Sequence, residues 1–186
     1  RIARLLNPRA TILNADFARV GLPQHFDLAV GNPPFSDRTV RSDPAFRGLG
    51  LRLHDFFIAK ALRLLKPGGL AAFVTSHGTM DKADASARRH IAETADLVGA
   101  IRLPEGSFRA DAGTDVVVDI VFFRKRGAGA TACGEGWLDL AQVRAATADE
   151  GAIRINGWFA KQQEMVLGIH ALTSGPYGET YTCTPR

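Results

Sequence analysis

The chain has 186 residues, 46% of them hydrophobic and 23% charged, which is enough to bury a sizeable core and excludes a fibrous or wholly disordered protein. The formal net charge of +4 permits a polyanionic partner without requiring one. Cys133 and Cys183 have no companion histidines at ligand spacing, and no apolar run has the length of a membrane span. We therefore expect a cytoplasmic protein with reduced thiols and without a metal site.

The first elements expected along the chain are a helix and two strands. Apolar residues among positions 2–6 form one side of a helix that ends at Asn7. A β-branched and apolar run follows at 11–16, and another apolar run follows at 26–31. We expect both runs to be strands of one sheet.

A long polar stretch at 36–52 follows the second strand. It carries four arginines, namely Arg38, Arg41, Arg47 and Arg52. A connection of this length in a compact domain is usually either functional or disordered. A solvated loop and a surface that binds a polyanion are both open at this point.

The remaining pattern predicts an α/β fold. Asp55 is the candidate cap of an amphipathic helix in which Lys60 points outward, and Pro67 with the two glycines after it ends that helix. Strand and helix then alternate, which indicates a mostly parallel, Rossmann-like sheet covered on both faces, with an antiparallel hairpin around 104–115. The expected elements are a strand at 70–75, a helix at 85–97, and strands at 98–103 and 116–124.

The most informative junction is the one where the strand at 26–31 runs into Asn32-Pro33-Pro34-Phe35. The two prolines fix φ at about −65° and remove two backbone donors, so Asn32 and the carbonyls beside it form a rigid set of acceptors next to an aromatic ring. Such a set fits a planar amino group on an aromatic ring. The Asn32 side-chain oxygen and the Pro33 carbonyl would accept one hydrogen each, and Phe35 would lie on the ring. A rigid exit from the strand is the alternative.

This tetrapeptide at a strand end resembles the catalytic motif of the S-adenosylmethionine-dependent N6-adenine DNA methyltransferases. The run at 11–17, which ends in Asp16 and Phe17, resembles the strand end that binds the adenosine part of the cofactor in this family. The resemblance implies that Asp16 accepts a hydrogen bond from the adenine amine and that Phe17 packs on the adenine ring. A helix cap at Asp16 and core packing at Phe17 are the alternatives.

The resemblance continues toward the C-terminus. Residues 103–125 look like the family's late loop and hairpin, and they imply that Phe108 clamps a flipped base opposite Phe35. Its alternative is a hydrophobic plug at the base of the hairpin. After a Gly- and Ala-rich linker at 127–136, residues 137–186 resemble the segment that follows the methylase in large phage- or plasmid-type polypeptides with a helicase. We expect a partial methyltransferase domain at 1–126 and an extension at 137–186.

The family also has a Gly-rich turn and an acid-ended strand before the strand matched by 11–16, and neither occurs in this chain. We therefore expect an N-terminally truncated methyltransferase that is inactive by itself.

The resemblance implies methyl transfer from S-adenosyl-L-methionine to the exocyclic amine of an adenine flipped out of double-stranded DNA, without a metal. Asn32, Pro33, Pro34 and Phe35 would carry the reaction, and Arg38, Arg41, Arg47 and Arg52 would contact the DNA backbone. Two alternatives stay open. One is a protein glutamine N5-methyltransferase, which usually has Tyr as the fourth motif residue, and the other is a non-catalytic DNA-binding fragment of a methylase. The host system could be restriction, phage or plasmid, and the sequence does not specify the DNA site.

Overall fold

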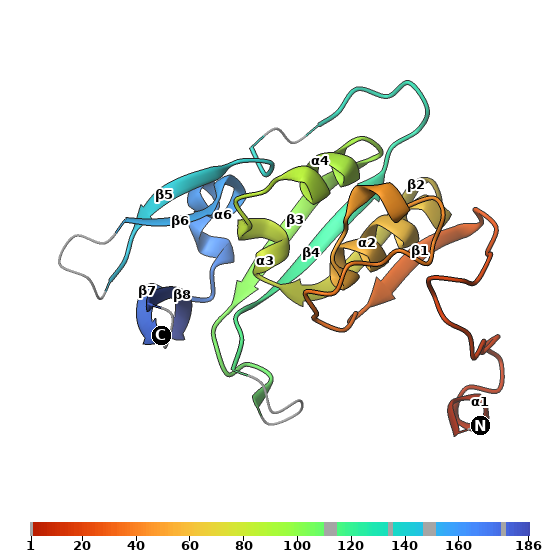
Figure 1. Cartoon of the computed structure of the whole chain (residues 1–186), viewed down its shortest axis with the longest axis horizontal. Helices are drawn as coiled ribbons and strands as arrows, with labels where there is room; N and C mark the ends of the chain where they lie inside the picture. The colour runs from red at the N-terminus through yellow and green to blue at the C-terminus, as the bar shows by residue number, and fades with distance from the viewer. Residues whose placement is uncertain (1, 110–114, 134–135, 147–151, 176–177) are drawn as a thin grey trace.

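The computed structural model describes residues 2–109, 115–133, 136–146, 152–175 and 178–186. Its centre is a four-stranded sheet in the order β1-β2-β4-β3 (Figure 1). The strands are β1 (Phe26–Gly31), β2 (Leu65–Ser76), β3 (Ala95–Leu103) and β4 (Val118–Lys125). β1 is parallel to β2, and β4 is antiparallel to both of its neighbours. The expected α/β class and the antiparallel hairpin at the end of the sheet are therefore confirmed.

Helices α2, α3 and α4 lie on one side of this sheet (Figure 1). The helical elements up to this point are α1 (Ile2–Leu6), η1 (Arg47–Leu49), α2 (Leu53–Leu64), α3 (Gly78–Asp81) and α4 (Ser86–Ala92). α2 buries Phe56, Ile58 and Leu62 because apolar residues recur along it at three- and four-residue steps. Within the described ranges, no helix is both long and apolar enough to cross a membrane.

Three local predictions are wrong. Residues 11–16 do not form a strand; no strand lies beside them in the described parts of the chain, and a strand without a neighbour leaves its backbone groups unpaired. α2 ends at Leu64, because Leu65 is already extended and residues 65–69 begin β2. α4 ends at Ala92, because residues 95–97 pair with β4 at the start of β3. In each case a long-range backbone contact, or its absence, decides the local structure.

The described residues after 136 form two antiparallel strand pairs and two short helices. The elements are β5 (Leu140–Arg144), β6 (Ala152–Asn156), α6 (Gly157–Lys161), η2 (Gln163–Met165), β7 (Gly168–Gly175) and β8 (Gly178–Pro185). The Asn156 side chain donates to the carbonyls of Met80 at 2.8 Å and Trp137 at 2.7 Å, and Trp158 Nε1 donates to the Ala100 carbonyl at 3.2 Å. This segment is thus bonded directly to the α3 and β3 region. The domain boundaries at 126 and 136 stay a prediction.

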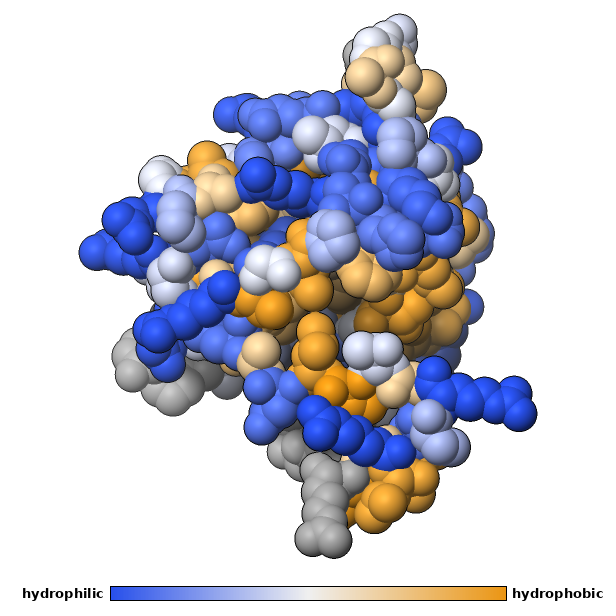
Figure 2. All heavy atoms as spheres, turned by 90° about the vertical axis from the view of Figure 1, so that its right-hand side faces the viewer, coloured by the Kyte–Doolittle hydropathy of each residue, from blue (hydrophilic) through white to orange (hydrophobic). Residues whose placement is uncertain are grey.

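The two faces of the sheet differ in burial. Side chains that face the helices, such as Phe73, Val121 and Phe123, are at most 5% exposed. On the opposite side Leu28 is 58%, Val30 72% and Leu70 47% exposed. The expectation that helices cover both faces is therefore wrong for β1 and β2. We call Leu28, Val30 and Leu70 the open face. Figure 2, which views the side of the molecule that carries β1, shows hydrophobic surface gathered around a hollow.

The open face predicts self-association. Contiguous apolar surface of this kind promotes contact between molecules, so the 186-residue protein should form oligomers or aggregates in the micromolar range. Replacing both Leu28 and Val30 by Thr places β-branched residues, which suit a strand, at both positions and should shift the population toward monomer. Analytical ultracentrifugation and light scattering measure this change.

The matched control is Leu49→Thr, because Leu49 is 41% exposed but lies on η1, outside the open face. It should leave the association unchanged. A wild-type protein that stays monodisperse and monomeric over the same concentration range would contradict the expectation.

Candidate active site

Asn32, Pro33 and Pro34 separate two cavities at the carboxyl end of β1. The smaller cavity has a volume of about 250 Å³ and the larger one about 430 Å³, and these three residues line both. A residue between two cavities can contact a group in each of them. The geometry therefore offers two binding spaces that meet at the motif.

The smaller cavity brings together residues far apart in the sequence. Its walls come from the motif, from β2, from the β3–β4 connection and from the start of β4, and they comprise Asn32, Pro33, Pro34, Phe35, Val74, Phe108 and Val118. The structure thus brings Phe108 and Phe35 to one cavity. Asn32 is exposed, and no other described residue forms a hydrogen bond with its side chain. The amide and two aromatic rings are consequently accessible to a ligand.

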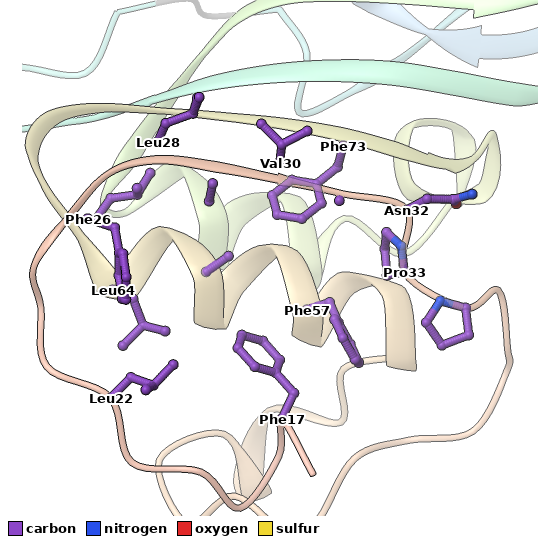
Figure 3. Close-up of a pocket in the computed structure, with 15 residues that line it drawn as sticks. Phe17, Leu22, Phe26, Leu28, Val30, Asn32, Pro33, Phe57, Leu64 and Phe73 are labelled. Atoms are coloured by element: carbon purple, nitrogen blue, oxygen red, sulfur yellow. The ribbon is translucent and has the colours of Figure 1, made fainter. Parts of the chain in front are cut away.

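The larger cavity is apolar and lies along β1 and α2 (Figure 3). Phe17, Phe57 and Phe73 line it, and the Phe17 and Phe57 rings are 4.9 Å apart with an interplanar angle of 34°. None of the described residues in its wall carries a charge. A flat, weakly polar ring fits such walls, whereas the ammonium and carboxylate groups of an amino acid would have no charged partner there.

Asp16 does not line either cavity. Its Oδ1 accepts the Ala18 amide N–H at 2.9 Å, and its backbone carbonyl accepts the amides of Arg19 and Val20. Its Oδ2 lies 3.5 Å from Arg19 Nε, with the Asp16 side chain 58% exposed. The structure therefore gives Asp16 the contacts of a turn-capping residue, while Phe17 beside it reaches the larger cavity.

A buried polar cluster beneath the motif was not anticipated from the sequence. The His54 ring lies edge-to-face against Phe35, with centroids 6.5 Å apart at 82°. His54 is 3% exposed, and none of the described residues forms a hydrogen bond with either of its ring nitrogens. Asp55 does not cap α2; it is buried and accepts a hydrogen bond from Thr79 Oγ1 at 3.0 Å. Burial lowers the pKa of His54 and raises the pKa of Asp55, so the surroundings favour the neutral form of each group.

The four arginines of the stretch at 36–52 differ in their contacts. Arg38 and Arg41 are exposed, and Arg47 Nε donates to the Arg41 carbonyl at 3.1 Å. Arg52 is different, because its Nη1 lies 2.8 Å from Asp37 Oδ1 and its side chain is only 33% exposed. The stretch itself is packed, since its Val40, Phe46 and Leu51 side chains are buried. It is an ordered surface segment with three accessible guanidinium groups.

Comparison with known proteins agrees with these features. The family model described as N-6 DNA Methylase matches residues 7–139. The curated protein named Defense against restriction protein B, from Escherichia phage P1, is 31% identical over 131 residues, which cover 67% of this chain and 6% of that protein. The chain therefore spans only a small part of this relative.

Solved structures similar to the chain include two proteins of low identity. One is described as a class I S-adenosylmethionine-dependent methyltransferase from Listeria monocytogenes, at 21% identity, with 67% of this chain and 37% of that chain covered and a TM-score of 0.49. The other is described as a modification subunit of a type I restriction enzyme from Vibrio vulnificus, at 22% identity, with 59% and 27% covered and a TM-score of 0.47.

The mixed sheet with the motif at the end of β1 fits the methyltransferase class to which the sequence pointed. Because the family model matches most of the chain, the protein belongs to the N-6 DNA methylase family. The resemblance drawn from Asn32-Pro33-Pro34-Phe35 is confirmed at this level.

The buried His54 predicts acid sensitivity of the fold. An unperturbed histidine has a pKa of about 6.5, and burial lowers that of His54. As the pH falls below about 7, the unfolded chain therefore binds a proton that the folded protein does not, and the free energy of unfolding decreases. His54→Phe should reduce this slope, by up to about 1.4 kcal/mol per pH unit, in urea unfolding series.

His25→Phe is the control for this series, since it replaces an exposed histidine elsewhere in the chain by the same residue. His170, whose pKa burial also lowers, is present in all three proteins and cancels in the comparison. If the free energy of unfolding changes equally with pH in wild type and His54→Phe, proton binding by His54 does not differ between the folded and unfolded states.

Proposed function

We propose that this chain carries the centre that transfers a methyl group from S-adenosyl-L-methionine to the exocyclic N6 amine of adenine in double-stranded DNA. One observation carries the proposal: Asn32, Pro33 and Pro34 lie between a cavity that contains Phe35 and Phe108 and an apolar cavity that contains Phe17. A methyl donor in one cavity and a methyl acceptor in the other would meet at these residues.

The reaction needs positioning more than acid or base catalysis. The lone pair of an adenine amine is delocalised into the ring and is a poor nucleophile. When the Asn32 side-chain oxygen and the Pro33 carbonyl accept its two hydrogens, the amine moves toward tetrahedral geometry and its lone pair becomes available. The bound cofactor supplies an electrophilic methyl group. The proton released from nitrogen then leaves to water through the same acceptors.

The residues of the larger cavity suit one end of the cofactor. Phe17 and the apolar walls would hold the adenine ring, whereas no charged side chain in the described wall would hold the amino acid end. Asp16 would need to leave its turn to reach the adenine amine. We therefore assign the adenine contact to Phe17, and we expect weak cofactor affinity from these residues alone.

Adenine is favoured over a glutamine side chain as the substrate. The smaller cavity has two aromatic rings in its wall, Phe35 and Phe108, and a carboxamide has no ring face to stack on them. Stacking would offset part of the few kcal/mol that extrusion of a base from the duplex costs. Arg38, Arg41 and Arg47 would contact the phosphates of the same DNA. A longer polypeptide that contains this chain, in the cytoplasm of a bacterial cell, is the expected setting, and a helicase segment in that polypeptide is part of the proposal.

The first test replaces the acceptor. In a protein that carries this chain, Asn32→Ala should lower methyl transfer about a hundredfold or more while S-adenosylmethionine binding is retained, because one oriented acceptor is lost. Incorporation of labelled methyl groups into unmethylated phage DNA measures the rate, and nucleoside analysis of the product identifies N6-methyladenine. Asn14→Ala, in an exposed position outside both cavities, is the control.

Transfer by Asn32→Ala within about threefold of wild type would remove Asn32 from the reaction. Label found in protein glutamine, with none in DNA, would favour the glutamine alternative. Cofactor binding without any transfer by wild type would favour the non-catalytic fragment.

The second test concerns the DNA surface. Replacing Arg38, Arg41 and Arg47 together by Ala should weaken DNA binding and reduce its log–log salt slope by up to about 2.7, since each lost phosphate contact removes about 0.9. Arg52 is left in place because it is paired with Asp37. Fluorescence anisotropy over a salt series gives the slope.

The matched control replaces three exposed arginines elsewhere, Arg124, Arg144 and Arg154. If both triple variants change the slope equally, the attraction reflects net charge rather than this segment.

A further inference from the structure

The C-terminal hairpin β7–β8 lies directly against the connection that carries Phe108. Two hydrogen bonds join them: the Glu105 amide N–H donates to the Cys183 carbonyl at 2.7 Å, and Thr182 Oγ1 donates to Glu105 Oε2 at 2.5 Å. Glu105 is three positions before Phe108. Strand β8, more than seventy residues away in the sequence, therefore bonds the turn that carries Phe108.

The close packing at Gly168 shows how tightly the two parts meet. A Cβ atom added at Gly168 would lie 3.2 Å from Pro104 Cβ, 2.6 Å from Cys183 Sγ and 2.4 Å from the Thr184 carbonyl oxygen. The two shorter approaches are to β8 of the hairpin itself, and the 3.2 Å approach shows that Pro104 packs closely against Gly168. The hairpin thus contacts both Pro104 and Glu105, the first two residues after β3.

The hairpin is itself fixed to the sheet by a buried contact. Tyr181 Oη accepts a hydrogen bond from Arg102 Nη1 at 3.1 Å, and Arg102 is 0% exposed. The Leu167 amide donates to the Arg102 carbonyl at 2.9 Å, so the chain enters β7 alongside β3. Because β8 is bonded to β3 in this way, its hydrogen bonds to Glu105 connect the turn to the central sheet.

The Phe108 turn also has contacts of its own among the described residues. Ser107 Oγ donates to the Pro104 carbonyl at 2.7 Å, Arg109 Nε donates to Asp115 Oδ1 at 2.5 Å, and Gly106 has φ +76°, which favours glycine. These contacts lie within the β3–β4 connection and shape the turn itself. The bonds from β8 to Glu105 come from outside this connection and join it to the C-terminal hairpin.

We propose that Thr182 and Glu105 are a positioning pair, through which the C-terminal hairpin holds Phe108 over the smaller cavity and so completes the site for the extruded base. This proposal rests on the proposed function of the cavity. Thr182 and Glu105 do not line the cavity and act through Phe108.

The test removes the side-chain bond and follows the turn directly. Thr182→Val is nearly isosteric and should raise amide exchange at 105–109 about tenfold, with the rest of the sheet unchanged, in hydrogen-exchange mass spectrometry. Thr182→Ser should restore wild-type exchange because it keeps the hydroxyl. Thr180→Val is the control, since the Thr180 hydroxyl on the same strand donates within the hairpin, to the Thr173 carbonyl at 3.4 Å. Glu105→Met removes the acceptor of the same hydrogen bond and should raise exchange at 105–109 in the same way. It replaces Thr182→Val in the test if that variant folds poorly.

Methyl transfer to DNA supplies the second measurement. Thr182→Val should lower kcat about tenfold with the dissociation constant for DNA unchanged, and Thr182→Ser should recover the rate. Combined with Phe108→Ala, Thr182→Val should cause no further loss, because both changes act through the same ring. A purely structural role would lower DNA affinity and melting temperature as well, and would add to Phe108→Ala.

The two measurements separate the proposals. Unchanged exchange at 105–109 in Thr182→Val overturns the positioning pair whatever the activity. Raised exchange with full methyl transfer also overturns it. If wild type transfers no methyl group to DNA, the proposed function fails, and the exchange measurement alone then decides whether the hairpin holds the turn.

Discussion

The fold depends on one buried guanidinium group. Arg102 lies on β3 opposite Asp119 of β4, and its Nε and Nη2 bond the two Asp119 carboxylate oxygens, each at 2.8 Å, with both residues 0% exposed. Its Nη1 reaches Asp81 of α3 at 2.8 Å and Tyr181 of β8 at 3.1 Å. The guanidinium plane also covers the Phe159 ring of α6 at 4.3 Å. One cation therefore connects the sheet, the helix after β2 and the C-terminal segment.

Such a group fixes geometry more than it adds stability. Desolvation of a buried ion pair offsets most of its Coulomb attraction, yet loss of one partner costs about 3–5 kcal/mol because a charge is left buried and unpaired. The register of β3 against β4, and the place where β8 meets the sheet, are thus restricted to arrangements that keep Arg102 paired. Because the connection between β3 and β4 carries Phe108, this restriction extends to the smaller cavity.

The sequence predicts those features that depend on short stretches of chain. The strand before Asn32 and the acceptors beside the two prolines follow from local pattern, and β4 was expected close to its actual bounds. Features decided by distant contacts were missed. Lys60 was expected to point outward, but it is buried, with Nζ 2.8 Å from Asp43 Oδ2. His54 has no sequence signal beyond a histidine on an amphipathic helix, and its place under Phe35 follows only from packing.

The expected strand at 11–16 and the expected coverage of both faces fail for a common reason, because each needs a neighbour on the free side of β1. Leu28 and Val30 also belong to the strand that lines the larger cavity, but their side chains point away from Phe17 and Phe57 (Figure 3). The apolar surface and the cavity therefore lie on opposite faces of β1. A group that binds in the cavity leaves the open face exposed to water, so occupancy of the cavity and self-association through the open face use different side chains.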